Sequence, residues 1–308
     1  MKKKSIFKAS FEESLNLEDD GFLQYQKRDV FSKLEKSYRK GRPTVGLHIQ
    51  NIILVLLGPI AINFMILVFS LSLHDSKPKD LTIPVSKYPF LTAEVYLIGL
   101  LIWLLLVLIG KFFRRTYILP YRNHFHVITF LVWLSLEFNL LAIDIFFPTL
   151  SNIGVFTFYV FISLLVYLMM RREIKYLEKR MYNVSSESLL LDRIAKILST
   201  YGTSILVIAL LVKIIFGGQL SKISDSMKGV GFLLMWIILN IAVIALIIFM
   251  EFPSYLQAYY KWKYPEEYRE WEGKSLEEWY GKRYLKKHPE LLEKEDYNQT
   301  HVHKEDTI

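Results

Sequence analysis

The sequence predicts an all-α protein: a polytopic transmembrane helical bundle of about six spans, with both termini in the cytoplasm and a small cytoplasmic C-terminal helical hairpin. Two observations support this prediction. Hydrophobic residues make up 52% of the chain, yet 22% of its residues are charged, so the charges must be concentrated between apolar segments. In addition, apolar runs of about 20 residues, the length that crosses a bilayer as a helix, can be placed six times.

The six predicted spans occupy residues 48–252, which we take as one transmembrane domain. The fifth span is the least regular, because Lys213 interrupts it. The predicted bounds are Ile49 to Leu73, Phe90 to Gly110, Phe125 to Phe147, Ile153 to Met170, Ile197 to Phe216, and Gly229 to Met250.

The distribution of Lys and Arg predicts the orientation of these spans. Basic residues are frequent before the first span, in segments 111–122 and 171–196, and after the last span, whereas the connection at Ser151 has none. Because positively charged loops stay on the cytoplasmic side, both termini are predicted to be cytoplasmic. The cysteine-free, Lys- and Ile-rich composition favours the cytoplasmic (inner) membrane of a bacterium.

The N-terminal segment, residues 1–47, is predicted to be cytoplasmic and to contain one amphipathic helix. Over Asp29 to Lys40, apolar residues recur at helical spacing among basic ones. Such a helix suits the inner headgroup layer, although a solvated helix has the same pattern.

The C-terminal region is predicted to form a helical hairpin over residues 253–292, followed by a disordered tail over 293–308. Pro265 suits the first position of one helix and Gly273 its end. Ser275 and Glu278 have the spacing of a capping box for the next helix.

Aromatic side chains in this hairpin make it a candidate partner-binding surface. Buried Trp and Tyr more often serve packing, so the same residues also suit docking onto the chain's own helices. The candidates are Trp262, Tyr268, Trp271, Trp279 and Tyr280.

Polar residues within the spans form a second group of candidates, because ionisable groups are costly inside a membrane. Glu137 and Asp144 are seven residues apart and therefore share one face of the third span. Two interpretations stay open: the group joins helices by buried hydrogen bonds, or it forms a proton or ion site centred on Glu137. The intramembrane candidates are Glu137, Asp144, Lys213, Asn139 and Asn63. Two further polar residues, Glu94 at the start of the second span and Asn240 within the sixth, belong to the same group.

Several other functions are disfavoured. The chain has no cysteine, and no nucleotide-binding loop, serine-nucleophile or metalloprotease motif occurs in it. The pairs His124 with His126 and His301 with His303 have no acidic or thiol partners at metal-site spacing, so neither a metal nor another cofactor is expected. The basic clusters flank the spans, which indicates lipid contact and not nucleic-acid binding.

Two functional hypotheses follow. The first is a non-enzymatic multi-pass protein that acts as an interaction, immunity or accessory factor on a membrane-protein partner. The alternative is a transporter or permease subunit with an intramembrane carboxylate site. A membrane enzyme is disfavoured, because no spacing in the sequence requires convergent catalytic groups.

Overall fold

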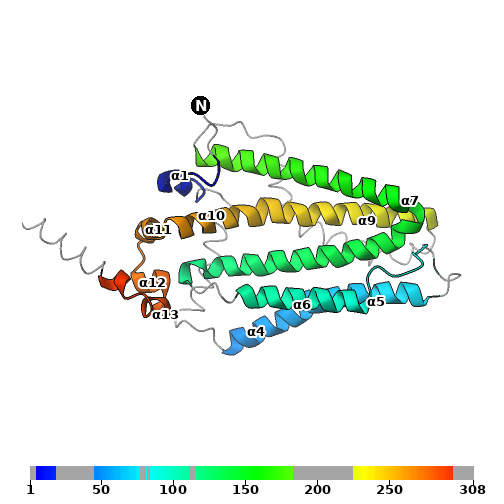
Figure 1. Ribbon diagram of the computed structural model, residues 1–308, viewed down its shortest axis with the longest axis horizontal. Helices are drawn as coiled ribbons and strands as arrows, with labels where there is room; N and C mark the ends of the chain where they lie inside the picture. The colour runs from blue at the N-terminus through cyan, green and yellow to red at the C-terminus, as the bar shows by residue number, and fades with distance from the viewer. Residues whose placement is uncertain are drawn as a thin grey trace, which may run out of the picture. The chain divides into compact units, whose positions relative to one another are not determined.

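Every regular element in the part of the chain that the computed structural model describes is a helix (Figure 1). The described residues are 5–18, 45–76, 81, 84–110, 115–182 and 225–293. The chain separates into two compact units, the first comprising Met1–Ile62, Ile98–Trp133 and Met250–Ile308, and the second Asn63–Leu97 and Leu134–Phe249.

Four of the described helices are long and apolar enough to cross a membrane, which supports the prediction of a helical membrane protein. They are Ile52–Asp75, Ala93–Gly110, Pro120–Met181 and Gly231–Lys263. Large apolar side chains on them face outward: Leu101 is 60% exposed and Phe156 70%. Such surfaces suit lipid and are too apolar for water. The predicted fifth span and the helix predicted over Asp29 to Lys40 lie outside the described residues, so the count of six and the orientation stay predictions.

The first long helix contains a π turn. Helix α4 (Val45–Val55) continues through η2 (Leu56–Ile60) into α5 (Ala61–Asp75). Pro59 lies in the π segment, where its missing N–H removes one helical hydrogen bond and its ring displaces the preceding turn. The second long helix, α6 (Ala93–Gly110), begins directly after Thr92. Glu94 lies exposed in its first turn, where its negative charge interacts favourably with the positive end of the helix dipole.

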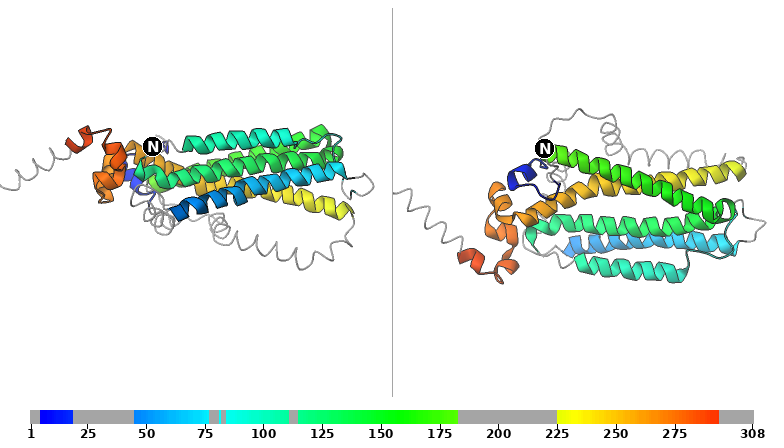
Figure 2. Two further views of the ribbon diagram at one scale, coloured as in Figure 1. Left: turned by 90° about the horizontal axis from the view of Figure 1, so that it is seen from below. Right: turned by 45° about the horizontal axis from the view of Figure 1, so that its top comes forward.

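The helix α7 (Leu119–Met181) is 63 residues long, about 95 Å at the rise of an α-helix and therefore far too long for a single span. It breaks at Ser151, where φ is 59° and ψ is 177°. The parts of α7 on either side of this break run antiparallel within the second unit (Figures 1 and 2). The predicted third and fourth spans lie on these two arms.

The second arm of α7 extends beyond the predicted end of the fourth span at Met170. It continues to Met181 through a segment rich in Arg, Lys and Glu, which are good helix formers. Tyr167 and Tyr176 each accept a hydrogen bond from the Arg four residues later. Side chains at this spacing support a helix without any membrane.

The last long helix also runs past its predicted end. Helix α9 (Asp225–Leu246) passes through a π turn, η5 (Ile247–Glu251), into α10 (Phe252–Lys263). Pro253 at the start of α10 explains the local change of pitch. The boundary predicted at residue 252 therefore falls inside a continuous helical segment.

Three short helices follow α10. Helix α11 (Pro265–Trp271) starts at Pro265 as predicted, and α12 (Leu276–Tyr280) has the predicted capping box of Ser275 and Glu278. The second predicted helix is interrupted at Gly281, where φ is 82°, and α13 (Lys282–Leu285) begins there. At the other end of the chain, α1 (Phe11–Leu15) carries a capping box of Ser10 and Glu13 that we did not predict.

Candidate functional site

Asp144 on α7 is fully buried, and it is surrounded by donors from the segment that precedes α6. Its Oδ1 accepts hydrogen bonds from the Ser86 hydroxyl at 2.7 Å and from the Phe90 N–H at 2.9 Å. The Ser70 hydroxyl lies 3.4 Å from Oδ2, and His74 Nε2 lies 3.5 Å from the same oxygen. We call these five residues the Asp144 cluster.

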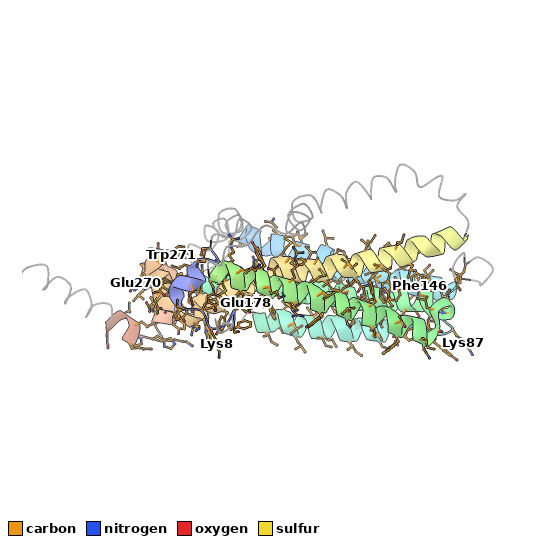
Figure 3. The ribbon with its side chains drawn as sticks, turned by 90° about the horizontal axis from the view of Figure 1, so that it is seen from above. Lys8, Lys87, Phe146, Glu178, Glu270 and Trp271 are labelled. Atoms are coloured by element: carbon orange, nitrogen blue, oxygen red, sulfur yellow. The ribbon has the colours of Figure 1, made fainter. Side chains whose placement is uncertain are left out.

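The Asp144 cluster fixes a loop to a helix. The backbone N–H of Ser86 donates to the Asp144 carbonyl oxygen at 2.8 Å, and the rings of Phe90 and Phe147 lie 5.6 Å apart. Lys87, in this loop, and Phe146, near the end of the first α7 arm, lie at the same end of the second unit (Figure 3). A carboxylate that accepts several short hydrogen bonds can be buried at a tolerable cost. This geometry supports a structural role for Asp144.

Asn139 is the centre of a second polar cluster, which joins both arms of α7 to α9. Its Oδ1 accepts hydrogen bonds from Trp236 Nε1 at 2.8 Å, Tyr159 at 3.0 Å and Asn240 Nδ2 at 3.2 Å. Its Nδ2 donates to Asn240 Oδ1 at 3.0 Å. Phe158 stacks on the buried Trp236 ring, with 3.8 Å between the ring centroids. These contacts are the interhelical polar contacts that hold membrane bundles together.

Glu137 and Asn63 are fully buried in the second unit. The Glu137 carboxyl lies within electrostatic range of the Tyr96 side chain on α6. The described bonding partners of Asp144 all come from residues 70–90. Lys213, another of the intramembrane candidates, lies outside the described part of the chain.

In the first unit, the N-terminal segment 5–18 lies on α10 and α11. Tyr260 accepts a hydrogen bond from the Ala9 N–H at 3.0 Å, and the Tyr264 hydroxyl donates to the Ala9 carbonyl oxygen at 2.9 Å. Ser14 and Tyr268 share a buried hydrogen bond of 2.9 Å. The N-terminal segment, η3 (Thr116–Ile118) and helices α10 to α13 are referred to below as the terminal module.

Charged groups are buried inside the terminal module. Lys261 is 6% exposed, and its Nζ lies 2.6 Å from Glu272 and 3.9 Å from Glu18. Gln257 donates to Glu18 at 2.5 Å and accepts a bond of 2.7 Å from the Tyr121 hydroxyl. This chain of contacts connects the N-terminal segment, α10 and the start of α7. Pairing of this kind offsets part of the cost of burying the charges.

Helix α12 is attached to η3 by aromatic packing. The Trp279 and Tyr117 rings stack at 4.6 Å, with their planes 9° apart. The Tyr280 hydroxyl donates to Glu266 at 2.6 Å, and burial raises the pKa of Tyr280 above its usual value, which keeps the hydroxyl protonated as a donor.

The histidines at the start of α7 serve different contacts. His124 Nδ1 lies 2.6 Å from Glu251 Oε2 in a buried pair. His126 instead packs against the Phe125 ring. Among the described residues there is no group of three His, Asp or Glu side chains suited to a metal ion, and His301 and His303 lie outside them.

The five aromatic candidates of the C-terminal region fall into two sets. Tyr268, Trp279 and Tyr280 are buried in the terminal module, as the packing alternative requires. Trp262 is 58% exposed and Trp271 48%, and Trp271 lies on α11 beside Glu270 (Figure 3).

Sequence reasoning missed most of the partners in these clusters. Ser70, Ser86 and His74 carry no motif, and the bond between Gln257 and Glu18 joins residues 239 positions apart. The tyrosine-rich run from 255 to 268 was a detectable signal, because buried Tyr hydroxyls need partners. Comparison with protein-family models, with curated proteins and with solved structures gave no match.

Proposed function

We propose that this chain is a non-enzymatic multi-pass membrane protein that acts as an interaction, immunity or accessory factor on another membrane protein, through its terminal module. In this proposal both termini lie in the cytoplasm, as the distribution of basic residues predicts. The partner contacts the module through Trp262 and Trp271.

The observation that carries the proposal is the exposure of these two tryptophans on an otherwise well-packed module. Trp262 and Trp271 are 58% and 48% exposed, whereas Trp279 of the same module is fully buried. Trp is highly buried on average, and it is enriched among the residues that dominate binding energy at interfaces. The module can present them rigidly, because hydrogen bonds from the N-terminal segment hold α10 and α11 in place.

The polar residues of the long helices support the same proposal. Asp144 and Asn139 engage several neighbours each in geometries that join helices or fix a loop. These bonds give both residues a structural use that needs no transported ion.

Affinity capture of the full-length protein in a mild detergent tests the proposal. The wild type is compared with the double variant Trp262→Ser and Trp271→Ser, which removes the two exposed rings and keeps the buried Trp279. We expect one stoichiometric membrane-protein partner with the wild type and at least a tenfold smaller yield with the double variant, since each anchor residue contributes about 2 kcal/mol. Photo-crosslinking from position 271 then identifies direct contact.

Tyr88→Ser is the matched control, because Tyr88 is also a large exposed aromatic, at 71%, but lies in the second unit. It should leave the captured partner unchanged. The proposal fails if the double variant retains the partner, or if neither protein captures one.

The second candidate is a transporter or permease subunit, and the complete burial of Glu137 favours it. An acidic residue deep in an apolar helix is a frequent element of proton and ion pathways. Glu137→Gln in proteoliposomes tests it by proton-flux measurement: a flux in the wild type that falls at least tenfold in the variant supports transport. No flux in either protein excludes proton transport through this residue.

A further inference from the structure

Four basic residues lie in the short helix α13 and in the turn that follows it. Lys282, Arg283, Lys286 and Lys287 are all exposed or partly exposed, whereas Leu285 between them is buried. Lys282 lies 3.1 Å from Glu277, an exposed pair that contributes little and leaves the lysine accessible. Within the described residues, Arg283, Lys286 and Lys287 form no ion pair.

Contacts with residues 115–117, just before α7, fix the position of this basic group. The Arg115 guanidinium lies 5.1 Å from the centre of the Tyr284 ring, and Trp279 stacks on Tyr117. At Gly281, directly before α13, a Cβ atom would lie 2.6 Å from the Thr116 hydroxyl oxygen. Helix α13 is therefore held against the residues that directly precede α7.

This position is close to the expected membrane surface. Tyr117 is eight residues before Phe125, the predicted start of the span, which corresponds to about 12 Å along a helix. The headgroup layer extends roughly 5–8 Å beyond the hydrocarbon core. Lys and Arg side chains are long and flexible, and the potential of an anionic surface reaches about 8–10 Å into solution.

We propose that Lys282, Arg283, Lys286 and Lys287 form a binding surface for the anionic headgroups of the adjacent bilayer leaflet. The partner is the lipid surface itself, recognised by its negative charge. Each basic residue close to an anionic leaflet increases the equilibrium constant for membrane binding about fivefold. The binding holds the terminal module at a fixed distance from the membrane.

A single fluorophore can test this surface, because the chain contains no cysteine. Leu292 is 44% exposed and follows the basic group, so Leu292→Cys provides a unique labelling site in the full-length protein. The labelled protein is placed in phosphatidylcholine nanodiscs that contain a small fraction of nitroxide-labelled lipid. The nitroxide is carried by either phosphatidylglycerol or phosphatidylcholine, near the headgroup end of the acyl chain.

The ratio of quenching by the two nitroxide lipids measures the local enrichment of anionic lipid. We expect phosphatidylglycerol to quench at least about fivefold more, and the difference to disappear in about 1 M NaCl, where the screening length is about 3 Å. The variant K282Q/R283Q/K286Q/K287Q should lower the ratio to about one. Circular dichroism and gel filtration of this variant check that it folds.

The matched control is K2Q/K3Q/K4Q/K8Q, which removes the same four positive charges near the N-terminus. It should keep the wild-type ratio; an equal loss would show that total charge, and not the α13 surface, attracts the lipid. Equal quenching by both lipids in the wild type overturns the proposal, as does absence of quenching by either one. If both nitroxide lipids quench equally, while heparin binds the wild type but not K282Q/R283Q/K286Q/K287Q, the partner is a soluble polyanion and not the lipid surface.

Discussion

At the scale of single residues, the burial of Asp144 shows how an acidic side chain is accommodated in an apolar helix. Its carboxylate accepts hydrogen bonds from Ser86 and from the Phe90 N–H, while the Ser70 hydroxyl and His74 lie nearby. Charge-assisted bonds of this kind are stronger than neutral ones and offset part of the desolvation cost. Asp144 therefore determines where the loop before α6 is attached.

Replacing Asp144 by Asn is predicted to destabilise the protein by about 1–3 kcal/mol. The amide has the same size, but one of its ends is a donor that faces other donors. Thermal unfolding in detergent, followed by tryptophan fluorescence, measures the effect.

Asp75→Asn is the control for this prediction. Asp75 lies at the end of α5, next to His74, but its side chain is exposed. Its replacement should change the stability by less than about 0.5 kcal/mol. Equal effects of the two substitutions would argue against the structural role of Asp144.

At the scale of elements, the long helices change course where particular residues require it. Pro59 lies in one π turn and Pro253 follows another, and Ser151 adopts a positive φ of 59° where α7 reverses. In the terminal module, Gly281 separates α12 from α13 with φ at 82° and ψ at 146°, a conformation that essentially only glycine adopts.

Gly281→Ala is predicted to destabilise the terminal module by about 2–3 kcal/mol. The new Cβ would be strained by the backbone conformation and would also lie 2.6 Å from the Thr116 hydroxyl oxygen. Local hydrogen exchange of residues 276–285 measures the effect.

Gly273→Ala separates the two contributions. Gly273 also has a positive φ, 63°, but a Cβ added at this position would have no atom within 4 Å, so only the backbone penalty of about 1 kcal/mol applies. If both glycine variants cost the same, the close approach of α12 to η3 is not important for stability.

At the scale of the whole molecule, segment 5–18 packs against the distant helices α10 and α11 in the terminal module. Tyr260 is fully buried, and its hydroxyl contacts the backbone of Ile6 and Ala9, more than 250 positions away in sequence. Closing so long a loop costs conformational entropy, which the buried contacts must offset. The N-terminal segment is consequently part of the folded structure.

Tyr260→Phe is predicted to loosen the N-terminal segment, because the Ala9 N–H loses its buried acceptor at a cost of about 1–3 kcal/mol. Trypsin cleavage after the exposed Lys8 should then become about tenfold faster, as measured by mass spectrometry of the released peptide. Tyr259→Phe is the neighbouring control, since the Tyr259 bond to Phe7 is exposed. Unchanged cleavage in Tyr260→Phe would contradict this role.

The helical class, the apolar segments and several helix ends could be predicted from the sequence. These properties depend on local features: run length for a span, the fixed φ of Pro265, and the capping spacing of Ser275 and Glu278. The sequence also identified Asp144 and Asn139 as costly polar residues within the helices, because burial of polar groups in lipid is unfavourable whatever the fold.

Which groups bond to those polar residues, and which aromatic rings are exposed, could not be predicted without the three-dimensional packing. Ser86 bonds to Asp144 across 58 positions, and Asn240 to Asn139 across 101. Trp262 and Trp279 lie in similar aromatic and charged stretches of the sequence, yet Trp262 is exposed and Trp279 is fully buried. Pairing and burial depend on how distant segments pack, and no local pattern encodes the distance between them.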